Sequence, residues 1–217
     1  MNLVMTLGLD GLERHRLAEA LVATDATEIL DMASGSGVLT FAIAEVYEAK
    51  KRTCKITGID FCAELLEIAR KELPTKHFPH TTIEFEEADA LHSPIADASV
   101  DAVTIGFGIR NFESRERTYA EILRVLRPGG HCFILETSHP RGLMSFLYKR
   151  LWVPMVPLIA RLAGSNPQAY LHLINSSKTF PDAEALAKEM EAAGFKNVKF
   201  TRLLGGSLAL HEGVKEK

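Results

Sequence analysis

The chain has 217 residues, of which 47% are hydrophobic and 24% charged, and its formal net charge is -3. This composition excludes a disordered or collagen-like chain, and the small negative charge gives no electrostatic reason to expect a nucleic-acid partner. The three cysteines, Cys54, Cys62 and Cys132, are widely separated and have no metal-ligand spacing. We therefore expect a cytoplasmic protein in a reducing compartment, without a metal site.

Strand and helix signals alternate along the first two thirds of the chain. A first helix ends over 18–22, and apolar residues at helical spacing predict further helices over 38–47, 63–73 and 115–126. Short apolar runs predict strands over 28–33, 54–60, 82–86, 100–106 and 131–136, and Pro128-Gly129-Gly130 is predicted to turn the chain before the last of these. Five β-α units in sequence predict a Rossmann-like α/β fold, a mostly parallel sheet with helices on both faces.

The pattern changes after Glu136. Residues 139–180 lack the β-α alternation, and we interpret them as a helical lid inserted into a single domain that spans 1–217. A last helix over 182–193 is bounded by Pro181 and Gly194, and the runs 196–204 and 207–211 predict a terminal antiparallel hairpin. The hairpin brings the expected sheet to seven strands.

The first candidate site is the run Asp31-Met32-Ala33-Ser34-Gly35-Ser36-Gly37 after the first strand. Ligands of open α/β sheets bind beyond the carboxyl ends of the strands. The two glycines let the backbone approach a ligand, the next helix offers N–H groups at its start, and Asp31 adds a carboxylate. A glycine turn alone is a weak signal, because many tight turns bind nothing.

Two more carboxylates follow the next two strands. Asp60 is placed to accept hydrogen bonds from ribose hydroxyls, although an Asp there also suits a cap for the helix that begins near Cys62. Asp89, followed by Ala90, is placed to accept the amine of an adenine, and its alternative is an ordinary loop residue. For either aspartate taken in isolation, the structural alternative is the better interpretation. Three carboxylates at three consecutive strand ends favour a nucleoside site.

The identity of the nucleoside depends on Thr40 and Asp31. A dinucleotide site has a third glycine where this chain has Thr40, so NAD is disfavoured. Asp31 suits a ligand with a cationic head, because its carboxylate attracts an ammonium group directly or through water. The pattern favours S-adenosylmethionine.

The sequence resembles the ubiquinone/menaquinone biosynthesis C-methyltransferases, the UbiE/MenG family, over nearly its whole length. The matching stretches are Asp31 to Gly37, Gly58-Ile59-Asp60, Asp89-Ala90, Ile105 to Asn111, Arg124 to Gly130, Leu135-Glu136, and Gly205-Gly206 with His211. The resemblance implies the class I methyltransferase fold and S-adenosylmethionine contacts at Ser36, Asp60, Asp89 and Ala90. The full set of expected cofactor-binding residues is Asp31, Ser34, Gly35, Ser36, Gly37, Asp60, Phe61, Asp89, Ala90 and Gly106.

The resemblance also implies a reaction, the methylation of a ring carbon on a polyprenylated quinol. The acceptor is demethylmenaquinol, the benzoquinol of ubiquinone biosynthesis, or both. Arg110 and Asn111 are the expected catalytic residues. Arginine stays protonated at neutral pH, so Arg110 would stabilise a phenolate or polarise a water, while Asn111 orients that water or the quinol oxygen. The alternative is a surface arginine paired with Glu113 or Glu116, beside a turn-forming asparagine.

Three departures from the family pattern are visible. Val38 occupies a position where the family has an aspartate, so we expect a reduced affinity for the cofactor. Met1 to Gly8 align with a stretch that in the family follows a helix with a Tyr-Asp pair, and that helix is not in this sequence. A truncated chain, a misassigned start and a naturally shorter lid all fit this difference. Gly106 occupies a position where other members carry serine.

The lid sequence raises the question of further partners. Met144 to Leu162 combines aromatic and aliphatic residues with Lys149, Arg150 and Arg161, a composition suited to sheltering an isoprenoid tail at an anionic membrane surface. A lid that packs on its own domain or in a homodimer fits equally well. Two other functions also stay open: a methyltransferase of this fold with another small acceptor, and a relative that binds the cofactor with little or no turnover.

Overall fold

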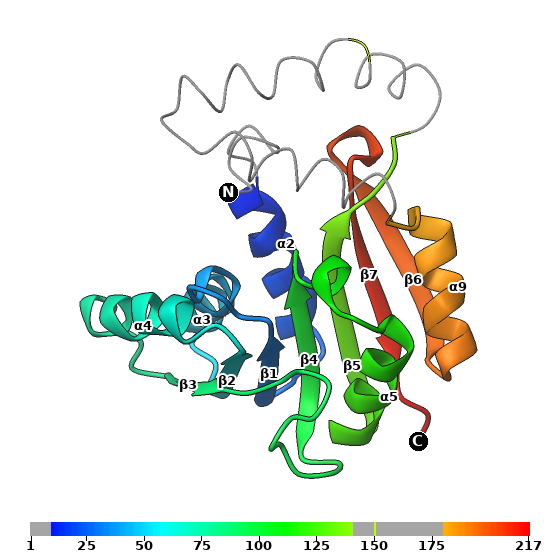
Figure 1. Ribbon diagram of the computed structural model, residues 1–217. Helices are drawn as coiled ribbons and strands as arrows, with labels where there is room; N and C mark the ends of the chain where they lie inside the picture. The colour runs from blue at the N-terminus through cyan, green and yellow to red at the C-terminus, as the bar shows by residue number, and fades with distance from the viewer. Residues whose placement is uncertain (1–9, 141–149, 151–179) are drawn as a thin grey trace.

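The computed structural model describes residues 10–140, 150 and 180–217, and its centre is one seven-stranded sheet (Figure 1). The strands follow the order β3-β2-β1-β4-β5-β7-β6. Their bounds are β1 Glu28–Met32, β2 Cys54–Asp60, β3 Thr81–Glu87, β4 Val100–Gly106, β5 Leu126–Thr137, β6 Lys196–Leu203 and β7 Leu208–Val214. Strands β1 to β5 are parallel, and β7 is antiparallel to both neighbours. The predicted mostly parallel sheet with a terminal hairpin is confirmed.

Helices cover both faces of the sheet (Figure 1). They are α2 Asp10–Val22, α3 Val38–Ala49, α4 Ala63–Glu72, α5 Arg115–Val125 and α9 Ala183–Ala193. Leu17 of α2 and Ile43 of α3 belong to a core on one face, while Tyr119 of α5 and Met190 of α9 belong to a core on the other. Alternate residues of each strand point to opposite faces, so the buried central strands supply both cores.

Helix boundaries follow the sequence signals. The Ser114 side chain accepts a hydrogen bond from the Arg117 N–H at the start of α5, and Asp182 accepts one from the Ala185 N–H at the start of α9. Gly194 ends α9 with a φ of 116°, a left-handed conformation that glycine adopts without strain. These caps explain why the predicted bounds of the last helix are confirmed.

Two local predictions are wrong. Residues 88–99, all of them described, contain no helix between β3 and β4, so the β-α alternation is interrupted there. Pro128-Gly129-Gly130 lies inside β5 and does not end it. Val100 pairs with Leu126 and Ala102 with His131, so the intervening residues of β5 bulge away from β4. The Gly129 N–H donates to the Lys215 carbonyl over 2.9 Å, a contact far along the chain.

The lid interpretation falls almost entirely outside the described residues, as do Met1 to Gly8 and His172. Within the described part of the chain, no helix combines the length and the apolar character needed to cross a membrane.

Candidate functional site

The candidate residues gather where parallel strands end. Asp31 of β1 lies opposite Gly58 of β2 and Thr104 of β4, and Asp60 lies opposite Glu87 of β3. Because these strands are parallel, the loops that follow them leave from one edge of the sheet (Figure 1). The sequence-predicted glycine turn, Asp60, Asp89 and Arg110 all lie at or directly after these strand ends.

Asp31 is completely buried beneath this edge. Its Oδ2 accepts a hydrogen bond from the Thr40 hydroxyl over 2.6 Å, and its Oδ1 accepts one from the Thr104 hydroxyl over 2.9 Å. Burial raises the pKa of Asp31 to about 6, although the two hydroxyl donors act in the opposite direction. Thr40, the residue that replaces the third glycine of a dinucleotide site, therefore serves to hydrogen-bond the buried Asp31 carboxylate. An ammonium contact at Asp31 stays a prediction.

The two glycines of the turn differ in their surroundings: there is space beside Gly35, whereas side chains pack closely against Gly37. Gly35 has a φ of 54°, and a Cβ there would meet nothing closer than the Leu65 Cδ1 at 3.7 Å. A Cβ on Gly37 would lie 2.9 Å from the Phe85 ring and 3.0 Å from the Phe41 ring. Gly37 is therefore needed for packing. The open side of Gly35 is the place where a ligand can approach the backbone.

Gly106 at the end of β4 is also tightly packed. A Cβ there would lie 2.9 Å from the Leu39 Cδ2 of α3. The Ser34 hydroxyl is buried and has no hydrogen-bond partner among the described residues, while Ser36 is half-buried. The cofactor contacts expected at Ser34, Ser36 and Gly106 stay predictions.

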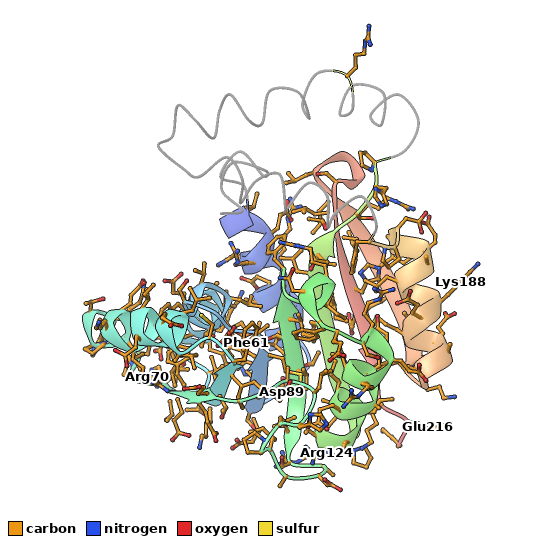
Figure 2. All side chains as sticks on the ribbon, viewed as in Figure 1. Phe61, Arg70, Asp89, Arg124, Lys188 and Glu216 are labelled. Carbon is orange, nitrogen blue, oxygen red and sulfur yellow. The ribbon has the colours of Figure 1, made fainter. Side chains whose placement is uncertain are left out.

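Asp60 connects the glycine turn to α4. Its Oδ2 accepts a hydrogen bond from the Gly35 N–H over 2.8 Å, and its Oδ1 accepts one from the Cys62 N–H over 2.9 Å. Cys62 is the N-cap residue of α4, and this helix start has no side-chain cap, so Asp60 binds the backbone just before the helix and does not cap its first turn. Each carboxylate oxygen retains a second lone pair, so these contacts leave capacity for ribose hydroxyls. Phe61, the next residue along the chain, is 75% exposed and is labelled in Figure 2.

Asp89 lies on the loop after β3 and is held by its neighbours (Figure 2). Its Oδ1 accepts the Leu91 N–H over 2.8 Å, and its Oδ2 lies 3.1 Å from the His92 Nδ1. The Leu91 contact, followed by the His92 contact, lowers the pKa of the exposed Asp89 carboxyl. Ala90, which follows it, is buried. The fixed, ionised carboxylate suits an amine donor.

Arg110 has a different partner from the one considered in the sequence. It lies in the short helix η2 Ile109–Asn111 and forms an ion pair with Glu136 at the end of β5, with 3% of the Arg110 side chain and 0% of the Glu136 side chain exposed. The alternative considered in the sequence, a surface arginine paired with Glu113 or Glu116, is therefore wrong. Packing of β4 against β5 brings Glu136 close, and Thr137 N–H also donates to this carboxylate over 2.6 Å.

The Arg110 Nε has no hydrogen-bond partner among the described residues, and it is buried. Asn111 is exposed at the same edge, and its backbone N–H donates to the Gly108 carbonyl over 3.0 Å. A fixed guanidinium whose Nε donor is unused, beside an exposed amide, can stabilise an oxygen anion. Direct contact of either residue with a substrate stays a prediction.

Sequence reasoning missed two charged residues here. Glu136 ends a buried strand, so the rule that identified Asp31 and Asp60 also applied to it. Arg14 of α2 is 7% exposed, and its Cζ lies 5.0 Å from the centre of the Phe107 ring. The sequence feature that could have identified Arg14 is its helical spacing from the apolar residues Leu17 and Leu21, which puts its charge on the apolar face of the helix.

Comparisons with known sequences match the chain over its full length. The model of the ubiE/COQ5 methyltransferase family matches residues 1–215. A demethylmenaquinone methyltransferase from Deinococcus radiodurans is 40% identical over 99% of this chain and 86% of its own length. The ubiquinone/menaquinone biosynthesis C-methyltransferase UbiE from Stutzerimonas stutzeri is 35% identical over 99% of this chain and 83% of its own length.

Solved structures share the fold at lower identity. The S-adenosylmethionine-dependent methyltransferase SibL is similar with a TM-score of 0.68 and 17% identity, covering 97% of this chain and 56% of that one. A Thermotoga maritima S-adenosylmethionine-dependent methyltransferase gives a TM-score of 0.63 and 16% identity, covering 99% of this chain and 93% of that one. These likenesses establish the class I methyltransferase fold.

Proposed function

The chain belongs to the ubiE/COQ5 methyltransferase family, and on that premise we propose that it transfers the methyl group of S-adenosylmethionine to a ring carbon of a polyprenylated quinol. Relatives of 33–40% identity are named for demethylmenaquinone, and another is named for both ubiquinone and menaquinone biosynthesis. We propose demethylmenaquinol as the first acceptor to test, and a benzoquinol as the second.

The residues present fit the cofactor. The open side of Gly35 and the buried, unpartnered Ser34 hydroxyl leave polar backbone and side-chain groups for a ligand at the turn. We assign Asp60 to the ribose hydroxyls, the exposed Phe61 ring to one face of the adenine, and Asp89 to the adenine amine. These assignments follow the order of the strand ends across the sheet.

When bound, S-adenosylmethionine supplies an activated methyl group, and the protein must align the acceptor and raise electron density on its ring carbon. We assign this activation to Arg110, whose charge would stabilise the oxygen anion formed when the neighbouring ring hydroxyl loses its proton. The ion pair with Glu136 holds the guanidinium in place. Asn111, exposed beside it, would orient the quinol oxygen or a water that takes the proton.

One observation carries the proposal: the turn joined by the Gly35–Asp60 hydrogen bond and the Arg110–Glu136 pair lie at the same edge of one sheet. A nucleoside held at the first would present its reactive end toward the second, because β1 and β4 are adjacent strands. Such proximity supports methyl transfer to a ring carbon of the bound phenolate.

The acceptor's tail extends the proposal to the sequence after β5. We propose that residues 139–180 form a lid within one domain that spans 1–217, and that its apolar and basic residues shelter the prenyl chain at an anionic membrane surface. The chain is then expected to sediment with vesicles containing an anionic phospholipid and not with neutral vesicles. Equal sedimentation with both, or with neither, would remove the membrane part of the proposal.

The reaction is tested by label transfer from methyl-labelled S-adenosylmethionine to demethylmenaquinol and to a benzoquinol that lacks the ring methyl. We expect label on a ring carbon of at least one quinol with the unchanged chain, a large loss with Arg110→Met, and little change with Arg127→Met. Arg127 pairs with Asp101 at the opposite end of the sheet. Cofactor binding by calorimetry without transfer to either quinol would contradict the assigned acceptor. No binding at millimolar cofactor would contradict the enzyme assignment itself.

A further inference from the structure

Three buried side-chain donors gather at the end of β5 without a hydrogen-bond partner among the described residues. They are the Arg110 Nε, the Thr137 hydroxyl and the Ser138 hydroxyl. A buried polar group that makes no hydrogen bond costs about 1–3 kcal/mol, because it has lost its contacts with water. The grouping of three such atoms indicates a place where a polar ligand group binds.

The Arg110–Glu136 ion pair brings these three donors together. The Arg110 Nη1 donates to the Glu136 Oε1, and the Thr137 N–H donates to the same oxygen over 2.6 Å. Two donors on one oxygen atom lie close to each other. The guanidinium therefore lies beside the residues that carry the two hydroxyls, at the edge where β4 and β5 finish next to each other (Figure 1).

The two hydroxyls lie on opposite sides of the strand. Thr137 pairs with Leu208 of β7, and the Ser138 N–H donates to the Ser207 carbonyl over 2.8 Å, so the chain is extended through both residues. Successive side chains of an extended strand point to opposite faces of the sheet. A ligand atom over the end of β5 is therefore within reach of one hydroxyl from each side and of the Arg110 Nε.

The proposed reaction forms an atom that needs such donors. When the ring hydroxyl of the quinol loses its proton, its oxygen becomes an anion that accepts several hydrogen bonds. We propose that the Thr137 and Ser138 hydroxyls donate to this oxygen beside the Arg110 Nε–H. Both hydroxyls keep their own protons, so they stabilise the anion and take no part in the proton transfer. The inference rests on the proposed function and adds two residues to the activation assigned to Arg110.

The test uses the variants Thr137→Val and Ser138→Ala and their combination, with the quinol that the unchanged chain methylates. The double variant is expected to lower kcat by roughly tenfold to a hundredfold, because two donors to the oxygen anion are lost. Its affinity for S-adenosylhomocysteine in calorimetry should be unchanged. Its melting temperature should be unchanged or higher, because the hydroxyls that are removed have no partner in the described part of the folded chain.

Thr118→Val is the matched control, because it removes a buried hydroxyl whose hydrogen bond is already made. Thr118 is 0% exposed, and its hydroxyl donates to the Ser114 carbonyl over 2.8 Å at the start of α5. This variant should keep the kcat of the unchanged chain. If the double variant does not fold, the single variants carry the comparison, each with an expected loss of about threefold to tenfold in kcat.

Two further measurements separate binding of the anion from a merely structural role. Thr137→Ser keeps a hydroxyl, so it should retain most of the kcat that Thr137→Val loses. A fluorinated counterpart of the same quinol forms its anion more readily and needs less help from the donors. The ratio of kcat between the unchanged chain and the double variant should therefore be smaller with the fluorinated quinol.

Three results would overturn the inference: an unchanged kcat of the double variant, an equal loss with Thr118→Val, or the same ratio of kcat with the fluorinated quinol. Each leaves the proposed function intact, because the unchanged chain still methylates the quinol. If the unchanged chain transfers label to neither quinol, the proposed function itself fails, so the two failures are distinguishable.

Discussion

The Asp31 carboxyl combines complete burial with two hydroxyl donors, and the balance between them is unfavourable to its charge. Burial raises the pKa of Asp31 from 3.8 to about 6. At neutral pH the group is therefore ionised, although its buried surroundings favour the protonated form. This rise in pKa corresponds to roughly 3 kcal/mol of stability, which is present below pH 3.8, the pKa of the group in the unfolded chain, and is lost as the pH rises through 6. Asp31 thus resembles a functional residue kept at a cost in stability.

Asp31→Asn should therefore stabilise the fold at pH 7.5. The amide keeps the shape and can still hydrogen bond to Thr40 and Thr104. Thermal unfolding followed by circular dichroism is expected to show a melting temperature several degrees above that of the unchanged chain, with the difference vanishing as pH falls from 6 to 4. A variant that is less stable at every pH by a constant amount would contradict this account.

Glu136 positions Arg110, and its effect should appear in turnover alone. Glu136→Gln keeps the acceptor for the Thr137 N–H and removes the charge that holds the guanidinium. We expect kcat to fall by about tenfold or more, with little change in the affinity for S-adenosylhomocysteine and a shifted pH profile of kcat.

The matched control is Glu189→Gln, which breaks the 2.7 Å ion pair with Arg115 between α5 and α9 on the half-exposed surface. It should leave kcat unchanged. A merely structural role for Glu136 predicts lower stability with normal kcat in the molecules that stay folded, and that result would contradict the positioning role.

At the scale of elements, α3 begins without an acidic residue in its first turn. The N-terminus of a helix carries a partial positive charge, so a carboxylate there stabilises it by about 0.3–1 kcal/mol. Val38 is the first residue of α3 and is 49% exposed, which leaves room for a substitution. The same position faces the glycine turn that we assign to the cofactor.

Val38→Asp is therefore expected to raise the melting temperature slightly and to tighten S-adenosylmethionine binding several-fold in calorimetry. Val38→Thr, which is similar in size to valine and uncharged, separates charge from polarity and should have little effect on affinity. Weaker binding by the aspartate variant would show that the valine is adapted to this site.

The contact between β7 and α9 introduces a second pH dependence, of opposite sign to that of Asp31. His211 is 1% exposed, and its Nε2 lies 2.9 Å from the Ala183 carbonyl at the start of α9. Burial lowers the pKa of His211 below its usual 6.5, so the folded chain favours the neutral imidazole ring. Its stability contribution is present above pH 6.5 and is lost as pH falls below that value, because the unfolded chain then binds the extra proton.

His211→Gln should therefore flatten the loss of stability between pH 7.5 and 5.5. Urea denaturation at the two pH values measures this difference for the unchanged chain and the variant, whatever the variant's absolute stability. The same loss in both chains would assign the acid sensitivity to other groups.

At the scale of the whole molecule, the sheet could be predicted because its information is local. The apolar runs that form β1, β2 and β4 and the caps of α5 and α9 are each contained in a few residues. The bulge in β5 could not be predicted. Proline and glycine are typical of turns, whereas the partner of Gly129 is Lys215, far along the chain.

The residues of the candidate site also divide into those that the local sequence locates and those whose contacts depend on packing between strands. Gly35, Asp60 and Asp89 could be located because each lies at the end of a strand or within three residues after it, and the rule about strand ends needs only the sequence. The Arg110–Glu136 pair depends on the packing of β4 against β5, and the hydrogen bonds to the buried Asp31 carboxylate come from hydroxyls of α3 and β4. Such contacts become visible only when the sheet is assembled.

The central claim is that residues from separate strand ends bind one molecule of S-adenosylmethionine at one edge of the sheet. A crystal structure with bound S-adenosylhomocysteine tests it most directly. The account predicts density over the Gly35 turn, with the ribose at Asp60, the adenine between Phe61 and Asp89, and the amino-acid end toward Asp31. Density for the ligand at any other surface, or contacts that include none of these carboxylates, would contradict the account.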